Sequence, residues 1–291
     1  MDPFAFPGLE GYALLDSGGG EKLERFGRYV LRRPDPQALW RPRLERKAWE
    51  AADYAFERKD DRGGSWRRRE RDLPLEWEMP IHGLQFRVHP TPFKHVGIFP
   101  EQASNWAWVE QQRGKLRAEK PRLLNLFGYT AVASVLAAHQ GWSVTHLDAS
   151  KASLDWASSN ARRNQTPQEG IRWVLEDALK FVHREARRQN TYHGILLDPP
   201  HYGRGPKGEK WQFEEGIAPL LEACRKLLAP DDASFLILST YAIGFSPMAF
   251  DNMLGDFGGG KVRSGELWLP EGDGDRRLPC GFCSRWTQVP R

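Results

Sequence analysis

The second half of the chain repeats one pattern, a short apolar segment followed by a longer amphipathic one, which predicts β-strands alternating with α-helices. Strands are expected at residues 122–126, 143–148, 171–175, 194–198 and 234–240, and helices at about 130–139, 151–164, 178–189 and 213–228. Strands that are joined through helices run parallel, with helices on both faces of the sheet. A later pair of segments, near 262–269 and 282–289, is expected to add an antiparallel hairpin at the edge. The predicted fold class is therefore α/β, a Rossmann-like and mostly parallel sheet of seven strands.

Residues 1–95 follow a different pattern, in which short strand-like stretches such as 28–31, 75–79 and 84–88 lie between Pro and Gly residues. This pattern predicts a small, mainly β domain with irregular connections, in which residues 44–58 form one helix. A chain of 291 residues is long enough for two domains. We therefore expect an N-terminal domain over residues 1–95 and a larger domain over residues 96–291.

The basic residues are concentrated in the N-terminal domain. Between Glu21 and Arg71 there are sixteen Lys and Arg against ten Asp and Glu, whereas the formal net charge of the whole chain is only +4. Six aromatic residues accompany them, namely Trp40, Trp49, Tyr54, Phe56, Trp66 and Trp77. Because basic side chains neutralise phosphates and rings stack on bases, this composition suits RNA. A solvated basic face over an aromatic core would give the same composition.

Other features of the sequence limit the class of protein. No apolar stretch approaches the roughly 18 residues of a membrane span, and the acidic, proline-broken N-terminus does not resemble a signal peptide. Cys224, Cys280 and Cys283 are too few for a disulfide framework or a four-cysteine metal site. Cys280 and Cys283 have the spacing of a redox pair but lie in a predicted strand, so two reduced, partly buried thiols are the preferred interpretation. We expect a cytoplasmic protein with no metal and no membrane partner.

The first strand of the predicted sheet runs into the segment Asn125-Leu126-Phe127-Gly128-Tyr129-Thr130-Ala131. A turn at Gly128, followed by a helix that opens near Thr130, leaves backbone N–H groups that can bind a carboxylate. A dinucleotide would need three glycines here, because its two phosphates must approach the backbone closely. Only Gly128 is present, and the bulky Phe127 and Tyr129 favour a nucleoside that carries an amino acid.

Two further strands end in acidic residues. Asp148 closes the second strand, where a carboxylate can accept hydrogen bonds from both hydroxyls of a ribose. Ser150 either belongs to the same site or caps the next helix. Asp177 follows the third strand, where it either accepts a hydrogen bond from the amino group of an adenine or caps the helix that begins at Ala178. Both alternatives stay open for Ser150 and for Asp177.

The fourth strand closes on Asp198-Pro199-Pro200, which is the most distinctive segment of the chain. Each proline fixes φ and lacks an N–H, so the carboxylate and the following carbonyls are held rigidly where open α/β sheets bind ligands. We expect the reacting centre here, with His201 as a proton acceptor, although an ordinary loop residue explains His201 equally well. Tyr202 is expected to stack on a flipped base. The basic, glycine-rich residues 203–208 are interpreted as a mobile lid that contacts phosphate, or as a simple exposed loop.

In this order the four strand ends would hold an amino-acid moiety, a ribose, a base and a reacting centre, which is the layout of an S-adenosylmethionine site. With these motifs the chain resembles the class I S-adenosylmethionine-dependent methyltransferases over residues 95–290. Within that class it is similar to the large-subunit ribosomal RNA methyltransferase family that includes cytosine carbon-5 enzymes.

The resemblance implies roles for individual residues. Asp148 would bind the ribose and Asp177 the adenine, the turn at 127–130 would bind the methionine end, and the loop after Asp198 would meet the acceptor. Residues 97–102 are similar to a stretch of that family that lies beside the cofactor. Further candidate contacts of the cofactor are Phe99, Gln102, Asn125, Ser150 and Ala178.

The chain departs from the cytosine carbon-5 enzymes at the position of their nucleophile. Those enzymes need a thiolate, because the ring carbon they methylate is not nucleophilic by itself. They place a cysteine directly after the Pro-Pro pair or at the end of the fifth strand, where this chain has His201 and Ser239-Thr240-Tyr241. Their usual N-terminal RNA-binding module is also absent from the sequence pattern. A nitrogen can attack an oriented methyl group unaided, so a base nitrogen is the expected acceptor.

The sequence therefore predicts an S-adenosylmethionine-dependent methyltransferase that acts on RNA, with ribosomal RNA as the preferred substrate. Two alternatives stay open. One is a methyltransferase for a protein or a small molecule, in which the charge of the N-terminal domain is incidental. The other is a non-catalytic RNA-binding or assembly factor that keeps the fold. The Asp198-Pro199-Pro200 segment and the acidic strand ends favour an active enzyme.

Overall fold

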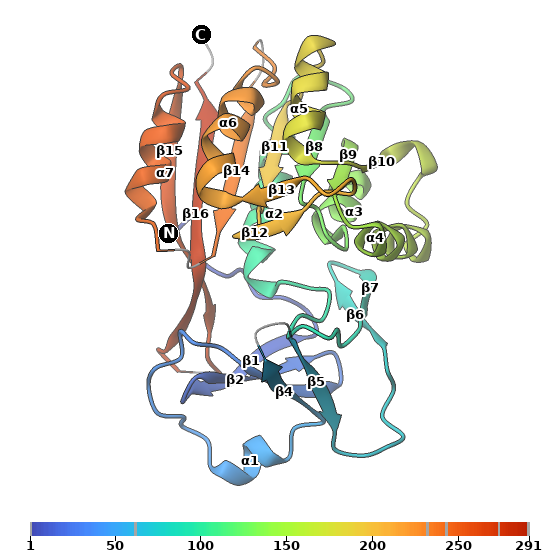
Figure 1. Ribbon diagram of the computed structural model, residues 1–291, viewed down its shortest axis with the longest axis vertical. Coiled ribbons are helices and arrows are strands. Elements are labelled where there is room, and N and C mark those ends of the chain that lie inside the picture. The colour runs from blue at the N-terminus through green and yellow to red at the C-terminus, as the bar shows by residue number, and fades with distance from the viewer. Residues whose placement is uncertain (1, 61–62, 231–232, 242–243, 273, 290–291) are drawn as a thin grey trace. The chain divides into compact units, whose positions relative to one another are not determined.

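The computed structural model describes residues 2–60, 63–230, 233–241, 244–272 and 274–289, and the chain divides into two compact units (Figure 1). The C-terminal unit comprises residues 1–4, 104–266 and 281–291, and the N-terminal unit comprises residues 5–103 and 267–280. Residues 267–280, near the end of the chain, thus belong to the N-terminal unit. A single boundary at residue 95 assigns them to the other domain. That boundary stays a prediction.

The C-terminal unit is built on a seven-stranded sheet, which confirms the predicted fold class. In spatial order the strands are β10 (Ile171–Leu175), β9 (Ser143–Asp148), β8 (Arg122–Leu126), β11 (Gly194–Leu197), β14 (Phe235–Thr240), β16 (Arg277–Gln288) and β15 (Gly260–Pro270). The strands from β10 to β14 pair in parallel, and β16 runs antiparallel to β14. The parallel strands lie within one residue of their expected bounds.

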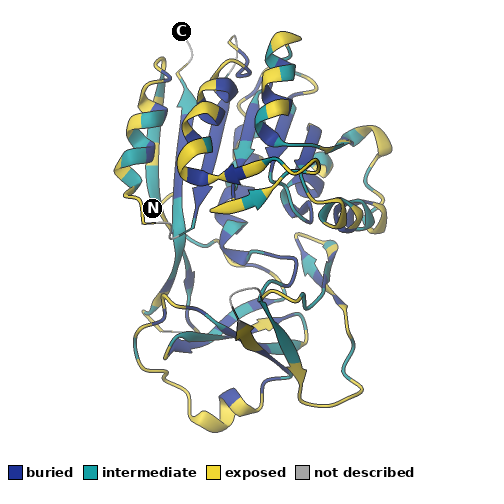
Figure 2. Cartoon of the chain, viewed as in Figure 1, coloured by how far each residue is buried: buried dark blue, intermediate teal, exposed yellow. Residues whose placement is uncertain are grey.

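Helices cover both faces of this sheet, and Figure 2 shows its buried strands beside helices with exposed outer sides. On one face α5 (Ala178–Arg187), α6 (Phe213–Arg225) and α7 (Pro247–Gly255) share a core with the strands. On the other face lie α2 (Ala103–Arg113), α3 (Val132–His139) and α4 (Lys151–Arg163). Trp108 of α2 packs on Phe235 with 4.9 Å between ring centroids. In the described part of the chain, no helix is long and apolar enough to cross a membrane.

Three elements of the C-terminal unit are not indicated by the sequence pattern. The apolar stripe of α2 is interrupted by buried Ser104, Asn105 and Gln112, and α7 is short. Residues 202–212 form a small hairpin of β12 (Tyr202–Arg204) and β13 (Lys210–Gln212). Residues 203–208, for which a lid or an exposed loop was expected, lie in β12 and the turn of this hairpin, where the Gly205 N–H donates to the Glu209 carbonyl at 2.8 Å.

The N-terminal unit is mainly β, as expected. Its five-stranded sheet has the order β1 (Tyr12–Gly18), β2 (Glu21–Phe26), β3 (Tyr29–Pro34), β4 (Tyr54–Asp60) and β5 (Gly63–Arg68). A second pair consists of β6 (Trp77–Ile81) and β7 (Leu84–Val88), and a 3-10 turn follows at Pro100–Gln102.

The prediction of one helix over residues 44–58 is wrong. Only α1 (Arg46–Glu50) is helical, and the chain then enters β4. Asp53 sets this change, because its carboxylate accepts from the Val30 N–H at 2.8 Å while its own N–H donates to the Val30 carbonyl at 2.9 Å. Tyr54 and Phe56 have high strand propensity, and β4 pairs with both β3 and β5. This pairing overrides the local helical pattern.

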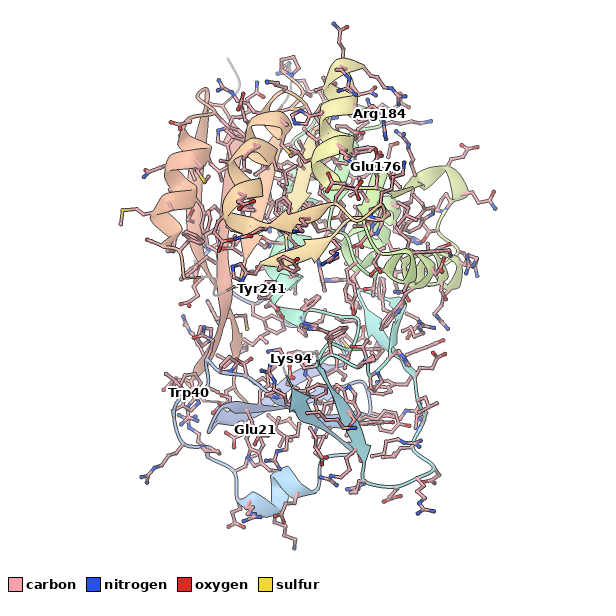
Figure 3. The ribbon with its side chains drawn as sticks, in the orientation of Figure 1. Glu21, Trp40, Lys94, Glu176, Arg184 and Tyr241 are labelled. Atoms are coloured by element: carbon pink, nitrogen blue, oxygen red, sulfur yellow. The ribbon has the colours of Figure 1, made fainter. Side chains whose placement is uncertain are left out.

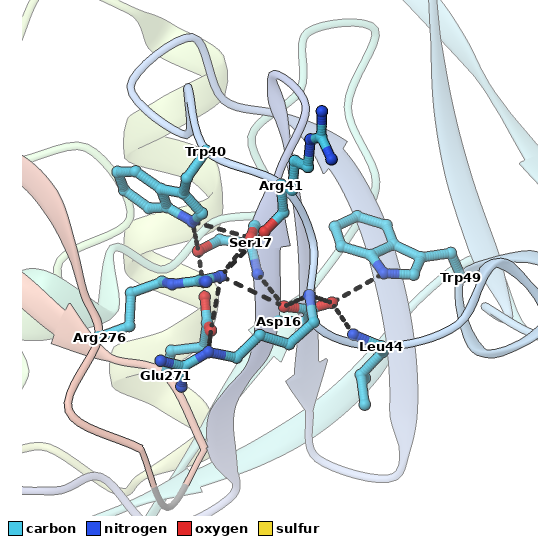
Figure 4. Close-up of polar contacts among 9 residues, drawn as sticks. Asp16, Ser17, Trp40, Arg41, Leu44, Trp49, Glu271 and Arg276 are labelled. Atoms are coloured by element: carbon cyan, nitrogen blue, oxygen red, sulfur yellow. Dashed lines mark hydrogen bonds and ion pairs between the residues drawn. The ribbon is translucent and has the colours of Figure 1, made fainter.

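A buried carboxylate, Asp16, organises one end of the N-terminal unit (Figure 4). It accepts from the backbone N–H groups of Arg43 and Leu44, at 3.1 and 2.8 Å, and from Trp49 Nε1 at 3.0 Å. Four further side chains join the same cluster. Ser17 donates to Glu271, and Arg276 Nη1 lies 3.1 Å from Glu271 Oε1. Trp40 Nε1 donates to the Ser17 carbonyl at 2.9 Å. This cluster fastens residues 40–49, Glu271 and Arg276 to β1.

Replacing Asp16 with Ala should destabilise the protein by about 3 kcal/mol, because it leaves buried N–H donors without an acceptor. Urea unfolding followed by tryptophan fluorescence measures this loss. Asp72→Ala, a change of the same type at an exposed position, should stay within about 0.5 kcal/mol of the wild type. Equal midpoints for the two variants would contradict this role of Asp16.

Candidate active site

The order of the strands reverses between β8 and β11, and this reversal positions the candidate site. The chain builds β8, β9 and β10 outward in one direction and then returns to place β11 on the other side of β8. Ligands of open α/β sheets bind at such a switch point, outside the carboxyl ends of the strands. Leu126 is in register with Leu197, so Phe127 and Asp198 leave the sheet side by side. The two most informative sequence motifs are therefore neighbours in space.

The loop after β8 has an unusual backbone. Phe127, Tyr129 and Ala131 have φ values of 58°, 51° and 68°, whereas the intervening Gly128 and Thr130 do not have positive φ. A non-glycine residue in this region costs about 1 kcal/mol or more, and such strain clusters at functional sites. Three N–H groups of the loop are already used, since Gly128 donates to the Leu147 carbonyl at 3.0 Å, Tyr129 to Asp148 Oδ2 at 2.9 Å and Ala131 to the Gly128 carbonyl at 3.1 Å. The strained turn thus fixes the loop to the end of β9 and orients Asp148.

Gly128 is required for close packing rather than for its backbone conformation. A Cβ at this position would lie 2.3 Å from Cε1 of His146, so the loop rests directly on the imidazole. Ser134 of α3 connects His146 to β8, with its Oγ 2.9 Å from His146 Nδ1 and 2.9 Å from Asn125 Nδ2. Burial lowers the pKa of His146 to about 3, so the ring under the loop is neutral at physiological pH.

Asn125 therefore supports the loop from within. Its side chain is buried on the face that packs against α3. Its contact with the cofactor stays a prediction, and the hydrogen bond with Ser134 gives it a structural role that the sequence pattern does not reveal.

The carboxylate of Asp148 is oriented by the backbone around it. Its Oδ2 accepts from the Tyr129 N–H at 2.9 Å, and its Oδ1 accepts from the Ser150 N–H at 2.8 Å. Burial raises the pKa of Asp148 above its ordinary value, and these backbone hydrogen bonds act in the opposite direction. Each carboxylate oxygen still has a second lone pair. Asp148 can therefore accept from two hydroxyl groups while the loop after β8 holds it in place.

Ser150 and Asp177 both cap helices. Ser150 Oγ accepts from the Ser153 N–H at 3.2 Å, and Asp177 Oδ1 accepts from the Lys180 N–H at 3.0 Å. Capping leaves Oδ2 of Asp177 for a ligand, so the adenine contact stays a prediction. The neighbouring Glu176 is held by Arg184 at 2.5 Å (Figure 3). Ala178 is buried in the core.

The loop after β11 is fastened to the loop after β8 by a residue to which the sequence pattern gives no role. Trp211 Nε1 donates to the Pro200 carbonyl at 2.7 Å, and the Trp211 ring lies 5.1 Å from that of Phe127. Gly216 permits this packing, because a Cβ there would lie 2.5 Å from the indole. A glycine inside a helix was the available signal, since it costs stability unless something packs closely against it.

His201 and Tyr202 are exposed beyond the Asp198-Pro199-Pro200 segment. His201 Nε2 lies 2.7 Å from Oε1 of Glu214 in the first turn of α6. If Nε2 carries the proton that this hydrogen bond needs, Nδ1 is an acceptor. The geometry thus permits the predicted proton-accepting role of His201, which stays a prediction, and adds Glu214 as the group that orients the ring.

Phe99 and Gln102 lie in the N-terminal unit. The Gln102 N–H donates to the Phe99 carbonyl at 3.1 Å, and the Phe99 ring lies 5.2 Å from His95. Their contact with a cofactor stays a prediction.

The cysteines are poor nucleophiles in this structure. Cys224 of α6 and Cys283 of β16 are buried, and Cys280 is partly buried. Burial raises the pKa of all three thiols, which disfavours the reactive thiolate. In the part of the chain that the structure describes, there is no cluster of His, Cys, Asp and Glu that could hold a metal ion.

The chain is similar to several known proteins. A sequence profile of the S-adenosylmethionine-dependent methyltransferases matches residues 53–248. The crystal structure of a SAM-dependent methyltransferase from Agrobacterium tumefaciens matches with a TM-score of 0.92 and 40% identity, covering 97% of this chain and 92% of that one. A solved structure from Streptococcus mutans shares the fold, with a TM-score of 0.73 at 19% identity, covering 98% of this chain and 77% of that one.

Curated relatives match over a shorter region. The ribosomal RNA large subunit methyltransferase K/L of Hahella chejuensis is 33% identical over 153 residues, which are 51% of this chain and 20% of that protein. The corresponding protein of Magnetococcus marinus is 30% identical over 152 residues, again 51% of this chain and 20% of its own length. The chain thus spans about a fifth of the length of these relatives.

Gly128→Ala should weaken the binding of S-adenosylhomocysteine at least tenfold, because the added Cβ pushes the loop off His146. Overpacking of this kind should also destabilise the protein by about 1–3 kcal/mol. Isothermal titration calorimetry and thermal unfolding measure the two effects. Gly255→Ala, where the new Cβ meets no atom within 4 Å, is the matched control and should leave both unchanged. Wild-type affinity in Gly128→Ala would refute the proposed packing of the loop.

The affinity for S-adenosylhomocysteine should fall as the pH falls below neutrality, because a protonated Asp148 loses acceptor capacity for the ribose. Since burial raises the pKa of Asp148, this loss should begin at a higher pH than the ordinary aspartate pKa of about 3.9 implies. His146, whose pKa burial lowers to about 3, is neutral at and just below neutral pH. Titrations at several pH values should show this dependence in the wild type and a flat profile in Asp148→Asn. Parallel profiles would exclude Asp148 as its source.

Proposed function

Because the chain belongs to the S-adenosylmethionine-dependent methyltransferase family, we propose that it methylates RNA in the cytoplasm, with ribosomal RNA as the substrate and a base nitrogen as the acceptor. S-adenosylmethionine, the cofactor of the family, supplies an electrophilic methyl group when it is bound. The observation that carries the proposal is the meeting of the loops after β8 and β11 at the switch point of the sheet, with Asp148 oriented beside them.

The residues at the switch point fit this cofactor. The strained turn at residues 127–131 follows β8 at the switch point, where the methionine end of the cofactor would lie. The orientation of Asp148 by Tyr129 and Ser150 leaves lone pairs for the two ribose hydroxyls. The second oxygen of Asp177 can accept from the adenine amino group. Contacts with the methionine end, the ribose and the adenine would thus follow one another at the ends of β8, β9 and β10, in the order of these groups in the cofactor.

Relatives support RNA as the substrate class. The curated relatives from Hahella chejuensis and Magnetococcus marinus are named for methylation of large-subunit ribosomal RNA. Because the chain spans a fifth of their length, RNA is a proposal for this chain.

The N-terminal unit gives less support to RNA binding than its composition predicts. Many of its arginines are paired with carboxylates: Arg32 with Glu21, Arg33 with Glu24, Arg46 with Glu50, Arg67 with Glu57 and Arg69 with Asp53. Of the aromatic residues, Trp49, Tyr54, Phe56 and Trp77 are buried. The buried rings thus fit the alternative interpretation of an aromatic core, whereas the surplus of positive charge remains, because the paired carboxylates are already counted in it.

A nitrogen acceptor is consistent with the groups beside Pro200. The carboxylate of Asp198 and the carbonyl of Pro199 are hydrogen-bond acceptors on a backbone that two prolines restrict. Two acceptors can hold the hydrogens of an amine so that its lone pair points at the methyl group, and orientation supplies much of the rate of such a displacement. The burial of Cys224 and Cys283 disfavours the thiolate that a carbon acceptor would need.

The test is to transfer labelled methyl groups from S-adenosylmethionine to RNA purified from a strain that lacks the protein. We expect label in ribosomal RNA from that strain, little in RNA from the parent strain, and mass spectrometry to show a nucleoside methylated on nitrogen. Asp148→Ala protein is the control and should transfer no label. Label in protein or small molecules instead would support the alternative substrates. Binding of RNA without any transfer would support a non-catalytic factor.

A further inference from the structure

The β12–β13 hairpin has two different faces. Its register places Tyr202 opposite Gln212, Gly203 opposite Trp211 and Arg204 opposite Lys210. Because side chains alternate along a strand, one face carries Trp211 and the other carries Tyr202, Arg204, Lys210 and Gln212. The solvent exposure agrees, since Trp211 is buried and these four residues are exposed. We call these four residues the outer face of the hairpin.

The opposite face of the hairpin, which carries Trp211, is attached to the loop after β11. Trp211 donates to the Pro200 carbonyl, and the Phe213 N–H donates to the His201 carbonyl at 2.9 Å. The far end is held as well, because Glu209 accepts from Lys180 of α5 at 2.7 Å and from the Lys207 N–H at 2.9 Å. The outer face is therefore presented by a supported element that begins four residues after Asp198.

The cations of the outer face are unlike the arginines of the N-terminal unit. Arg204 and Lys210 stand directly opposite each other, an arrangement of like charges that destabilises an antiparallel pair. Lys207 adds a third cation at the tip. In the described part of the chain, these three residues take part in no ion pair, and Glu209, the one acidic residue of the hairpin, is held by Lys180. An anionic partner would remove the repulsion.

We propose that the outer face of the β12–β13 hairpin binds the strand of RNA that carries the acceptor nucleotide. Arg204 and Lys210 contact its phosphates, and the ring of Tyr202, which is 55% exposed, stacks on a base next to the reacting centre. The occupant is single-stranded RNA, because a base must be free of its helix to stack on a side chain. This inference rests on the proposed function and names the surface that recognises its substrate.

The test compares two double variants of the full chain, each losing two positive charges. Arg204→Gln with Lys210→Gln removes the cations of the outer face, and Arg46→Gln with Lys47→Gln removes two exposed cations of α1. The probe is large-subunit ribosomal RNA from a strain that lacks the protein, and binding is measured between 50 and 200 mM salt. Unchanged affinity for S-adenosylhomocysteine shows that each variant is folded.

We expect the hairpin variant to bind this RNA about tenfold more weakly at 100 mM salt. Its slope of log affinity against log salt should be shallower by about 1.4, because each lost phosphate contact on a single strand removes about 0.7. The α1 variant should stay within twofold of the wild type. Tyr202→Ala should weaken binding at least fivefold, and Tyr202→Phe, which keeps the ring, should not.

The outcomes separate this inference from the proposed function. Salt-dependent RNA binding by the wild type with no change in the hairpin variant, or an equal loss in both double variants, would overturn the role of the outer face alone. Absence of RNA binding by the wild type, in protein that binds S-adenosylhomocysteine, would overturn both.

Discussion

The pairing of β8 with β11 is the contact on which the candidate site depends. The register of Leu126 with Leu197 delivers two loops to one point at the carboxyl edge of the sheet. One is a strained loop that follows β8, and the other is the Asp198-Pro199-Pro200 segment. The indole of Trp211 then joins them, through a hydrogen bond to Pro200 and a ring contact with Phe127. The two loops proposed to hold the cofactor and the reacting centre are thus adjacent because of strand order and one side chain.

The electrostatics of the site divide into a neutral support and a charged surface. His146, Ser134 and Asn125 form a buried hydrogen-bonded chain under the loop, and the low pKa of His146 keeps that chain free of charge. Asp148 carries its charge at the carboxyl end of β9, where burial raises its pKa and the N–H groups of Tyr129 and Ser150 act against that rise. An uncharged, hydrogen-bonded support beneath an oriented carboxylate suits the binding of a nucleoside whose sugar donates hydrogen bonds.

The sequence was sufficient where a local pattern reports burial and insufficient where contacts join distant residues. The parallel strands and their acidic ends could be predicted, because apolar runs and the residues that end them are local features. The helix over 44–58 was wrong, since pairing of β4 with β3 and β5 decides that segment. Trp211 and Glu214 acquire their roles only because the β12–β13 hairpin and α6 fold back onto the loop after β11. The aromatic residues of the N-terminal unit show the same limit, because a composition does not reveal that Trp49 and Tyr54 are buried.

We infer that the cofactor binds at the switch point between β8 and β11. Amide hydrogen exchange, measured by mass spectrometry with and without saturating S-adenosylhomocysteine, tests it most directly. The account predicts slower exchange in peptides that cover residues 127–131, 148–150 and 198–203, because the ligand would cover these backbone amides or fix the loops that carry them. Unchanged exchange in all three regions, in protein that calorimetry shows to be fully bound, would contradict it.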